Sequence, residues 1–304
     1  MRNRRCAIVG LEAITSLGAG AEEVWSQMLR GTCGIRRMAR FPHGTYTTDF
    51  AAEVPPEAEA LLRSAVGGRE DSRAFLFAVA AGRRMLRDRS APSAGLVLAT
   101  TKAEVGQLEC LASGGEASPR HNPYVLACDV AAALGLGGPV MAVSNACASG
   151  LLAILQAAHL LRRGAAERMV VIGVDVLAEF LLAGFSALQA LSPQPCRPYD
   201  AARDGLSRGE GAGALLLAAE PEPGETVLGE VAGGGVANDA CHITAPSRTG
   251  EGLRAAIERA LAASGLRPAG VHAINGHGTA TVYNDAMEAA AVHQVFGSDG
   301  PPLG

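Results

Sequence analysis

A cysteine between an apolar strand and a helix is the first candidate for chemistry in this sequence. Cys147 lies in the segment VMAVSNACASGLLAILQAAHLLRRG, whose apolar run ends at Val143 and whose helical part ends at Gly164. A helix is predicted to begin at the cysteine, where backbone N–H groups stabilise a thiolate and lower the thiol pKa. The same amides can donate to an oxyanion that develops on an acyl thioester. The pattern alone also fits a buried structural cysteine.

The second candidate is a histidine in the segment INGHGTATVYNDAMEAA. His277 lies in a turn flanked by glycines, where a ligand can approach the chain closely. Thr279 and Thr281 alternate on an extended stretch and can offer hydroxyls to a polar ligand arm. Asn284 or Asp285 can cap the helix that follows. A lone histidine in a turn also fits a hydrogen-bonded structural residue, and the Gly-His-Gly-Thr-x-Thr context favours a catalytic one.

Composition narrows the function classes. The chain has 304 residues, 48% of them hydrophobic, and a net charge of −4, which gives no basic surface for nucleic acid. Its seven cysteines are scattered and lack a C-x-x-C pair, which argues against a disulfide framework or zinc site and favours a reducing compartment. No stretch reaches the roughly 18 apolar residues of a membrane span. Because Glu12 interrupts the N-terminal apolar run, a first strand is predicted there rather than a signal peptide. We expect a soluble cytoplasmic protein.

The elements that would position these residues follow an α/β pattern, in which short β-branched runs alternate with longer Ala/Leu-rich segments. Strands are predicted over Arg5–Val9, Gly95–Ala99, Val140–Val143, Arg168–Val174, Gly213–Ala218, Val227–Ala232 and Val271–Asn275. Helices are predicted over Ala21–Leu29, Ser72–Arg87, Ala148–Arg163, Glu251–Ser264 and Asp285–Phe296. The stretch Phe41–Val66 is predicted to be irregular and Ala112–Pro123 to be a loop.

The turn-rich connector AEPEPGET divides the chain into two predicted halves, residues 1–224 with the cysteine and residues 225–304 with the histidine. The second half contains only two predicted strands and two predicted helices. Two strands do not make a stably covered sheet. Either they add to the first half or part of the second half is missing.

Four collinear segments resemble the β-ketoacyl-acyl-carrier-protein synthase family. SNACASG is similar to its nucleophile motif, and LSPQPCRPYDAARDGLSRGEGAG is similar to S-P-x-x-x-C-R-P-F-D-x-x-R-D-G-F-x-x-G-E-G-A-G, with Tyr199 and Leu206 in place of phenylalanine. NDACHITAPSRTGEG and HGTATVYNDAMEAAAVHQVFG resemble two further motifs of the family. Together with the N-terminal VGLEAITSLGAGAEEVWSQMLRGTCGI, the resemblance covers the whole chain.

The resemblance implies a thiolase-like fold with α-β-α-β-α layers, and a decarboxylating Claisen condensation with malonyl-acyl-carrier-protein. Cys147 would take the acyl chain as the nucleophile, and His277 would be one of two histidines that stabilise the enolate. Thr279 and Thr281 would bind the phosphopantetheine arm. Structural support would come from Asp285 and from Glu288, the latter as a buried ion-pair partner.

No cofactor or metal is implied, because the substrates are carried on the phosphopantetheine of an acyl carrier protein. That carrier protein is the expected partner, together with a second synthase subunit in a homodimer or heterodimer. Fatty-acid, polyketide and aryl-polyene assembly all remain open as pathways.

One family stretch, K-S-x-x-G-H-x-x-G with a lysine and the second histidine, does not occur before the sequence ends at VFGSDGPPLG. We therefore expect a C-terminally truncated member whose second half is incomplete. Two alternatives remain. The chain could be a non-catalytic partner similar to a chain-length factor, although such partners usually replace the nucleophilic cysteine. It could also be an inert truncated gene product.

Overall fold

The computed structural model describes residues 6–67, 72–87, 89, 91–242 and 245–304. The chain forms two compact units. The first unit comprises Met1–Phe41, Ala51–Gly184 and Arg208–Val231, and the second comprises Pro42–Phe50, Phe185–Ser207 and Ala232–Gly304. Arg5, where the first strand is predicted to begin, and residues 243–244 of the third family motif lie outside the described residues.

A seven-stranded mixed sheet forms the centre of the first unit, in the order β10-β1-β9-β7-β5-β6 with β2 paired to β1. Its strands are β1 (Ala7–Thr15), β2 (Gly18–Ala19), β5 (Gly95–Ala99), β6 (Val140–Val143), β7 (Arg168–Asp175), β9 (Gly211–Ala218) and β10 (Gly229–Glu230). Strand β5 is parallel to β6 and β7, whereas β9 is antiparallel to β7 and β1. The carboxyl ends of β1, β5, β6 and β7 therefore meet the start of β9 at one edge of the sheet.

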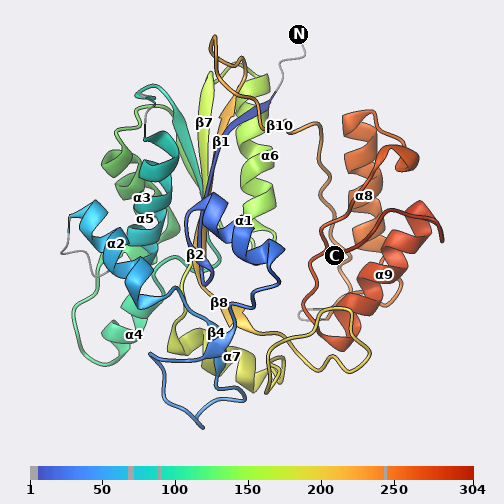
Figure 1. Cartoon of the computed structure of the whole chain (residues 1–304), viewed down its shortest axis with the longest axis horizontal. Coiled ribbons are helices and arrows are strands. Elements are labelled where there is room, and N and C mark those ends of the chain that lie inside the picture. Colours follow the sequence, from blue (N-terminus) through green and yellow to red (C-terminus); the bar gives the residue numbers. More distant parts are fainter. Residues whose placement is uncertain (1–5, 68–71, 88, 90, 243–244) are drawn as a thin grey trace. The chain divides into compact units, whose positions relative to one another are not determined.

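Helices cover both faces of this sheet (Figure 1). On one face lie α3 (Arg73–Leu86) and α5 (Pro123–Leu134), and on the other lies α6 (Ser149–Arg162). Helix α3 begins after Ser72, whose hydroxyl accepts from the Phe75 N–H, and its central residues are almost all buried. Large side chains such as Phe77 stabilise this layer by about 1.5–3 kcal/mol each on burial.

Shorter elements complete the first unit around the sheet. Helices α1 (Ala21–Leu29), α2 (Pro56–Val66) and α4 (Gly106–Ala112) and the 3-10 turn η1 (Pro119–His121) belong to it. A small sheet has the order β3-β4-β8, with β3 (Arg36–Arg37), β4 (Phe50–Ala52) and β8 (Arg208–Gly209). The chain crosses between the units within β4 and within α7 (Glu179–Ala187).

The prediction of irregular structure over Phe41–Val66 is wrong, because α2 and β4 form there. Pro55 and Pro56 suit the start of a helix, where the first N–H groups have no partner within the helix. Gly67, with a φ of 118°, ends it. The two prolines, on which the prediction of irregular structure is based, therefore mark the start of a helix.

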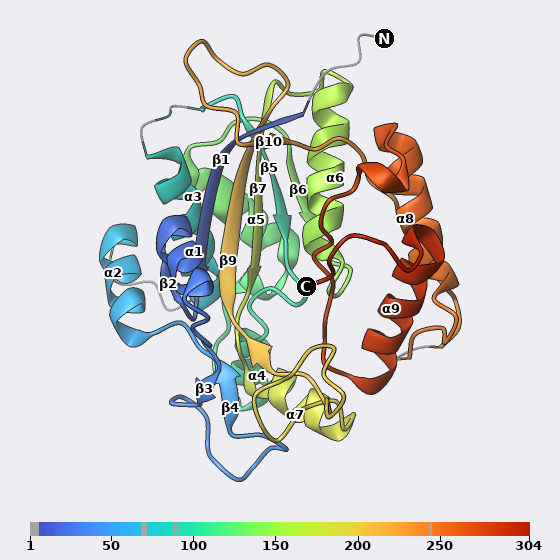
Figure 2. The same cartoon turned by 45° about the vertical axis from the view of Figure 1, so that its right-hand side comes forward.

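Helices are the main regular elements of the second unit, and the strand prediction that falls in it, over Val271–Asn275, is wrong. Helix α8 (Glu251–Ser264) packs on α9 (Val282–Phe296), with the 3-10 turn η2 (Pro268–Gly270) between them in sequence (Figure 2). Of the strand predicted over Val271–Asn275, the described structure contains one parallel bridge, between Ile274 and Leu303. The strand predicted over Val227–Ala232 forms in part, as β10 of the first unit, where it pairs with β1 and so adds to the sheet of the first half. Within the described residues, every helix is too short or too polar to span a bilayer.

Candidate active site

Cys147 lies in a tight turn between β6 and α6. Ala146 adopts a left-handed conformation with a φ of 46°, and Ser149 locks the turn with its hydroxyl. The Ser149 Oγ accepts from the Asn145 N–H at 2.7 Å and donates to the Ala146 carbonyl at 2.6 Å. The helix begins two residues later than the cysteine, with Ala148 as its N-cap. Cys147 is exposed and lies one residue before the helix N-cap, where the macrodipole favours an anion.

The thiol lines a cavity of about 400 Å³ at the sheet edge where the strand ends meet. Cys147 and Ala146 contribute from the turn. The other walls come from the ends of β1 and β7, the end of β5 with the two threonines that follow it, and the starts of β9 and α6. Small residues predominate, including glycines at 150, 173, 211 and 213. The first unit therefore leaves open space beside the candidate nucleophile.

A carboxylate and two hydroxyls form a polar wall of this cavity. Asp175, the last residue of β7, accepts from the Thr100 Oγ1 at 3.1 Å, from the Thr101 Oγ1 at 2.9 Å and from the Thr101 N–H at 2.9 Å. The hydroxyl of Ser144, the residue that directly follows β6, donates to the Thr101 carbonyl at 3.0 Å. These residues are absent from the sequence prediction. A usable signal is their position at the carboxyl ends of parallel strands, where ligands bind in α/β sheets.

A half-buried arginine interacts electrostatically with the thiol. Burial lowers the pKa of Arg208 in β8, while the charges of Asp175 and of Cys147 act in the opposite direction. The positive charge of Arg208 attracts a negative charge on the Cys147 sulfur, and this attraction favours the thiolate form. Arg208 is not predicted from the sequence, because nothing in the local pattern of the Gly-Leu-Ser-Arg-Gly stretch indicates proximity to the cysteine.

The turn that carries His277 is held by one buried carboxylate in the second unit. Glu288 accepts from the His277 N–H at 2.7 Å, the Gly278 N–H at 2.8 Å, the Asn284 Nδ2 at 2.9 Å and the Tyr199 hydroxyl at 3.2 Å. The expected ion pair of Glu288 is not found among the described residues. The carboxylate instead serves as the hydrogen-bond acceptor around which the turn is built.

Asp285 braces the same turn from the first turn of α9. It is buried and accepts from the Tyr199 N–H at 2.7 Å and the Ala280 N–H at 3.1 Å, and Arg203 lies 3.8 Å from it. The prediction that Asn284 or Asp285 caps this helix is wrong, since both lie within α9 and Thr281 is the N-cap. Burial raises the pKa of Tyr199 to about 12, helped by the charge of Glu288 and its hydrogen bond.

The two predicted threonines lie side by side after the histidine. The Oγ1 atoms of Thr279 and Thr281 are 2.9 Å apart, and both residues are half-buried. Gly278 and Ala280 alternate with them at positive φ, 52° and 61°. His277 itself is exposed.

The structure thus gathers the predicted residues of the second unit, His277, Thr279, Thr281, Asp285 and Glu288, in one turn and the helix after it. Cys147 belongs to the first unit.

Comparisons with known proteins agree along the whole chain. Residues 3–222 match the family model of the β-ketoacyl synthase N-terminal domain, and residues 228–303 match that of the C-terminal domain. A 3-oxoacyl-[acyl-carrier-protein] synthase 2 of Staphylococcus aureus (strain COL) is 30% identical over 97% of this chain and 78% of its own length. Nodulation protein E of Rhizobium leguminosarum bv. trifolii is 33% identical with the same coverage.

The solved structure of the ishigamide ketosynthase/chain length factor superposes with a TM-score of 0.88 at 29% identity, and the match covers 99% of this chain and 80% of that one. The thiolase-like α/β fold expected from the sequence is confirmed by this likeness. With both domain models matched in order, the chain belongs to the β-ketoacyl synthase family.

Proposed function

We propose that Cys147 is the acyl-accepting nucleophile of a decarboxylating condensation with malonyl-acyl-carrier-protein. The observation that carries this proposal is the exposed thiol beside a helix start, lining a cavity of small residues within electrostatic reach of Arg208. The Cys147 thiolate attacks the carbonyl of an acyl thioester, and the carrier-protein thiolate leaves and takes up a proton. The acyl group is then held on the cysteine sulfur.

His277 is the proposed donor for the second half-reaction. Loss of CO₂ from the malonyl thioester leaves an enolate, whose carbon attacks the acyl carbonyl on Cys147 and releases the thiolate. A hydrogen bond from His277 to the thioester oxygen would stabilise that enolate. Thr279 and Thr281 offer adjacent hydroxyls to the phosphopantetheine arm.

Asp285 and Glu288 are proposed to act through the backbone of the His277 turn. Their carboxylates accept its N–H groups and thereby fix where the imidazole and the two threonines lie. They are positioning residues in this proposal.

The proposed partners are an acyl carrier protein and a second synthase subunit, and the proposed compartment is the cytoplasm. The curated relative from Staphylococcus aureus acts, by its name, on an acyl-carrier-protein substrate. Both fatty-acid and polyketide assembly are compatible with the relatives.

A chain-length-factor-like role is the second candidate, favoured by the likeness to a structure that pairs a ketosynthase with a chain length factor. In that role the subunit would shape the acyl tunnel of its partner and would not need a reactive thiol. The accessible Cys147 and its Arg208 neighbour favour the synthase role.

The two half-reactions are tested separately with acyl-carrier and malonyl-carrier protein. His277→Ala is expected to leave acylation of the protein unchanged and to lower CO₂ release by about 10²–10³. His272→Ala, which removes another exposed histidine of the same unit, is the matched control and is expected to change neither. CO₂ release by the parent chain that is measurable above background and unchanged in His277→Ala would contradict the role of His277.

A further inference from the structure

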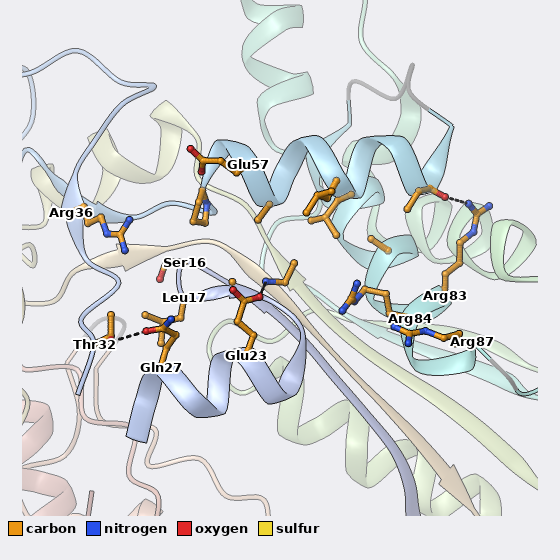
Figure 3. A pocket seen from close by; sticks show the side chains of 18 residues that line it. Ser16, Leu17, Glu23, Gln27, Thr32, Arg36, Glu57, Arg83, Arg84 and Arg87 are labelled. Atoms are coloured by element: carbon orange, nitrogen blue, oxygen red, sulfur yellow. Dashed lines mark hydrogen bonds between the residues drawn. The ribbon is translucent and has the colours of Figure 1, made fainter. Parts of the chain in front are cut away.

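A second cavity lies in the first unit, and it shares no lining residue with the Cys147 cavity. It is a groove of about 560 Å³ bounded by α1 and α2, with α3 contributing at one end (Figure 3). Its volume lies within the range of about 300–1,000 Å³ that is typical of small-molecule sites. The proposed condensation does not use it.

On the α2 side, the middle of the groove is apolar, whereas the Glu23 carboxylate lies opposite it on the α1 side (Figure 3). On α2, Ala58, Leu61, Leu62 and Ala65 follow one another at i, i+3, i+4 and i+7, which places them on one helix face over about 10 Å. Leu62 is buried to 2% exposure and anchors α2, whereas Leu61 is 71% exposed. The groove therefore presents a narrow apolar stripe to solvent.

One end of the groove is cationic. Arg83, Arg84 and Arg87 gather there from the end of α3, and Arg36 lies toward the other end near Glu57 (Figure 3). Four arginines and two glutamates line the groove, the second being Glu23, so its formal charge is 4 − 2 = +2.

Contacts within the protein neutralise only part of the positive charge of these arginines. Arg84 lies 3.3 Å from Glu12, and the Arg83 Nη1 donates to the Ala65 carbonyl at 2.9 Å. Glu23 accepts from the Ala19 N–H at 3.2 Å, so its carboxylate is turned to the backbone. For Arg87, no ion pair is found within the part of the chain that the structure describes.

We propose that this groove binds a fatty acid, a single alkyl chain that ends in a carboxylate. The carboxylate would bind the arginines at the end of α3, since arginine N–H groups match carboxylate oxygens in pairs. The alkyl chain would lie along the α2 stripe and cover Leu61. The groove has positive charge at one end and an apolar stripe along α2, and a fatty acid has a negative charge at one end and an alkyl chain behind it. A uniformly polar anion would leave the stripe uncovered, and a neutral lipid would leave the arginines unpaired.

The test is titration of dodecanoate into the full chain by isothermal calorimetry, below the micellar concentration. Cys147 is alkylated beforehand, so that the acyl cavity is blocked and binding there does not contribute. One saturable site is expected, and dodecanol, which lacks the charge, is expected to bind at least tenfold more weakly. Octanoate is expected to bind more weakly than dodecanoate, because it covers less of the stripe.

Two exposed substitutions locate the site. Arg87→Glu and Leu61→Asp are each expected to weaken dodecanoate binding about tenfold or more, by reversing the charge or by placing a carboxylate on the stripe. Arg30→Glu and Leu29→Asp are the matched controls, since both lie at the end of α1 outside the groove and Leu29 is 70% exposed. Equal binding of dodecanol and dodecanoate, or unchanged binding in both groove variants, would overturn the proposal.

Discussion

At the residue scale, the thiols of this chain differ sharply in their surroundings. Cys6 is fully buried, and burial raises its pKa to about 11 despite the nearby Arg162. Cys147 is exposed at a helix start near a cation. Cys33, Cys110 and Cys241 are exposed too, but none of them precedes a helix N-cap in this way. Thiolate content, rather than exposure alone, is therefore expected to set their order of reactivity.

Iodoacetamide at neutral pH is expected to label Cys147 first and Cys6 last. Peptide mass mapping after short labelling times gives the order directly, with the three other exposed cysteines as internal controls. Faster labelling of Cys33, Cys110 or Cys241 would count against an activated thiol at position 147.

Removing the charge of Arg208 is expected to slow that labelling. A neighbouring cation lowers a thiol pKa, so Arg208→Met raises it and leaves less thiolate at neutral pH. We expect a several-fold lower alkylation rate of Cys147 at pH 7 and convergence of the two proteins at high pH, where the thiol is ionised in both. Arg30→Met, at an exposed arginine, is the control. Rates that coincide at every pH would show that Arg208 does not act on the thiol.

At the element scale, the turn before α9 depends on hydrogen bonds to two carboxylates, of which Glu288 accepts from the backbone at His277 and Gly278 and Asp285 accepts at Ala280. Glu288→Ala removes the acceptor of two partly buried backbone N–H groups and of the Asn284 and Tyr199 side chains. We expect it to lower the free energy of unfolding by about 3 kcal/mol. Tyr199→Phe removes a single bond and is expected to cost about 1 kcal/mol. Urea unfolding measures both.

Tyr283→Phe is the matched control for Tyr199→Phe, because Tyr283 lies on α9 and its side chain is 64% exposed. A cost of Glu288→Ala no larger than that of Tyr199→Phe would mean that the carboxylate does not hold the turn.

Elements with an unambiguous local pattern were predictable from the sequence. Helices α1 and α8 and strands β5 and β6 match their predicted bounds at both ends. The two helices have a periodic apolar pattern that begins after a glycine, and the two strands are short apolar runs that end at polar residues. The missed helix α5 is rich in alanine and apolar nearly all round, so it carries little amphipathic signal.

The candidate site was predictable only where residues are neighbours in sequence. The turn from His277 to Glu288 is local, and its residues were identified together. Asp175 and Arg208 join the Cys147 surroundings through sheet topology, from segments far apart in the chain. Single-sequence patterns contain no information on such tertiary neighbours.

At the scale of the whole molecule, the main sheet ends on a strand with one neighbour. Among the described strands, β6 pairs only with β5, and its four residues are half-buried. An edge of this kind offers unpaired backbone groups to a second chain. We expect the protein to be a dimer, and light scattering across a dilution series measures it. A monomer at every concentration, with a cooperative melt, would contradict an assembly through this edge.

The chain matches 78% of the length of its Staphylococcus aureus relative, and it contains Cys147 and His277, the residues proposed here to act in the two half-reactions. Of these two steps, acyl transfer needs the thiolate, the start of α6 and the cavity at the strand ends, all within the first unit. It is therefore the step by which the central claim is tested most directly.

That measurement is intact-mass detection of acyl transfer from an acyl-carrier protein to the 304-residue chain, followed by peptide mapping. We predict one acyl group per chain, located on Cys147, and no acylation of Cys147→Ala, while Cys110→Ala is acylated like the parent. Acylation that persists in Cys147→Ala, or a parent chain that takes up no acyl group, would contradict the assignment of Cys147 as the nucleophile.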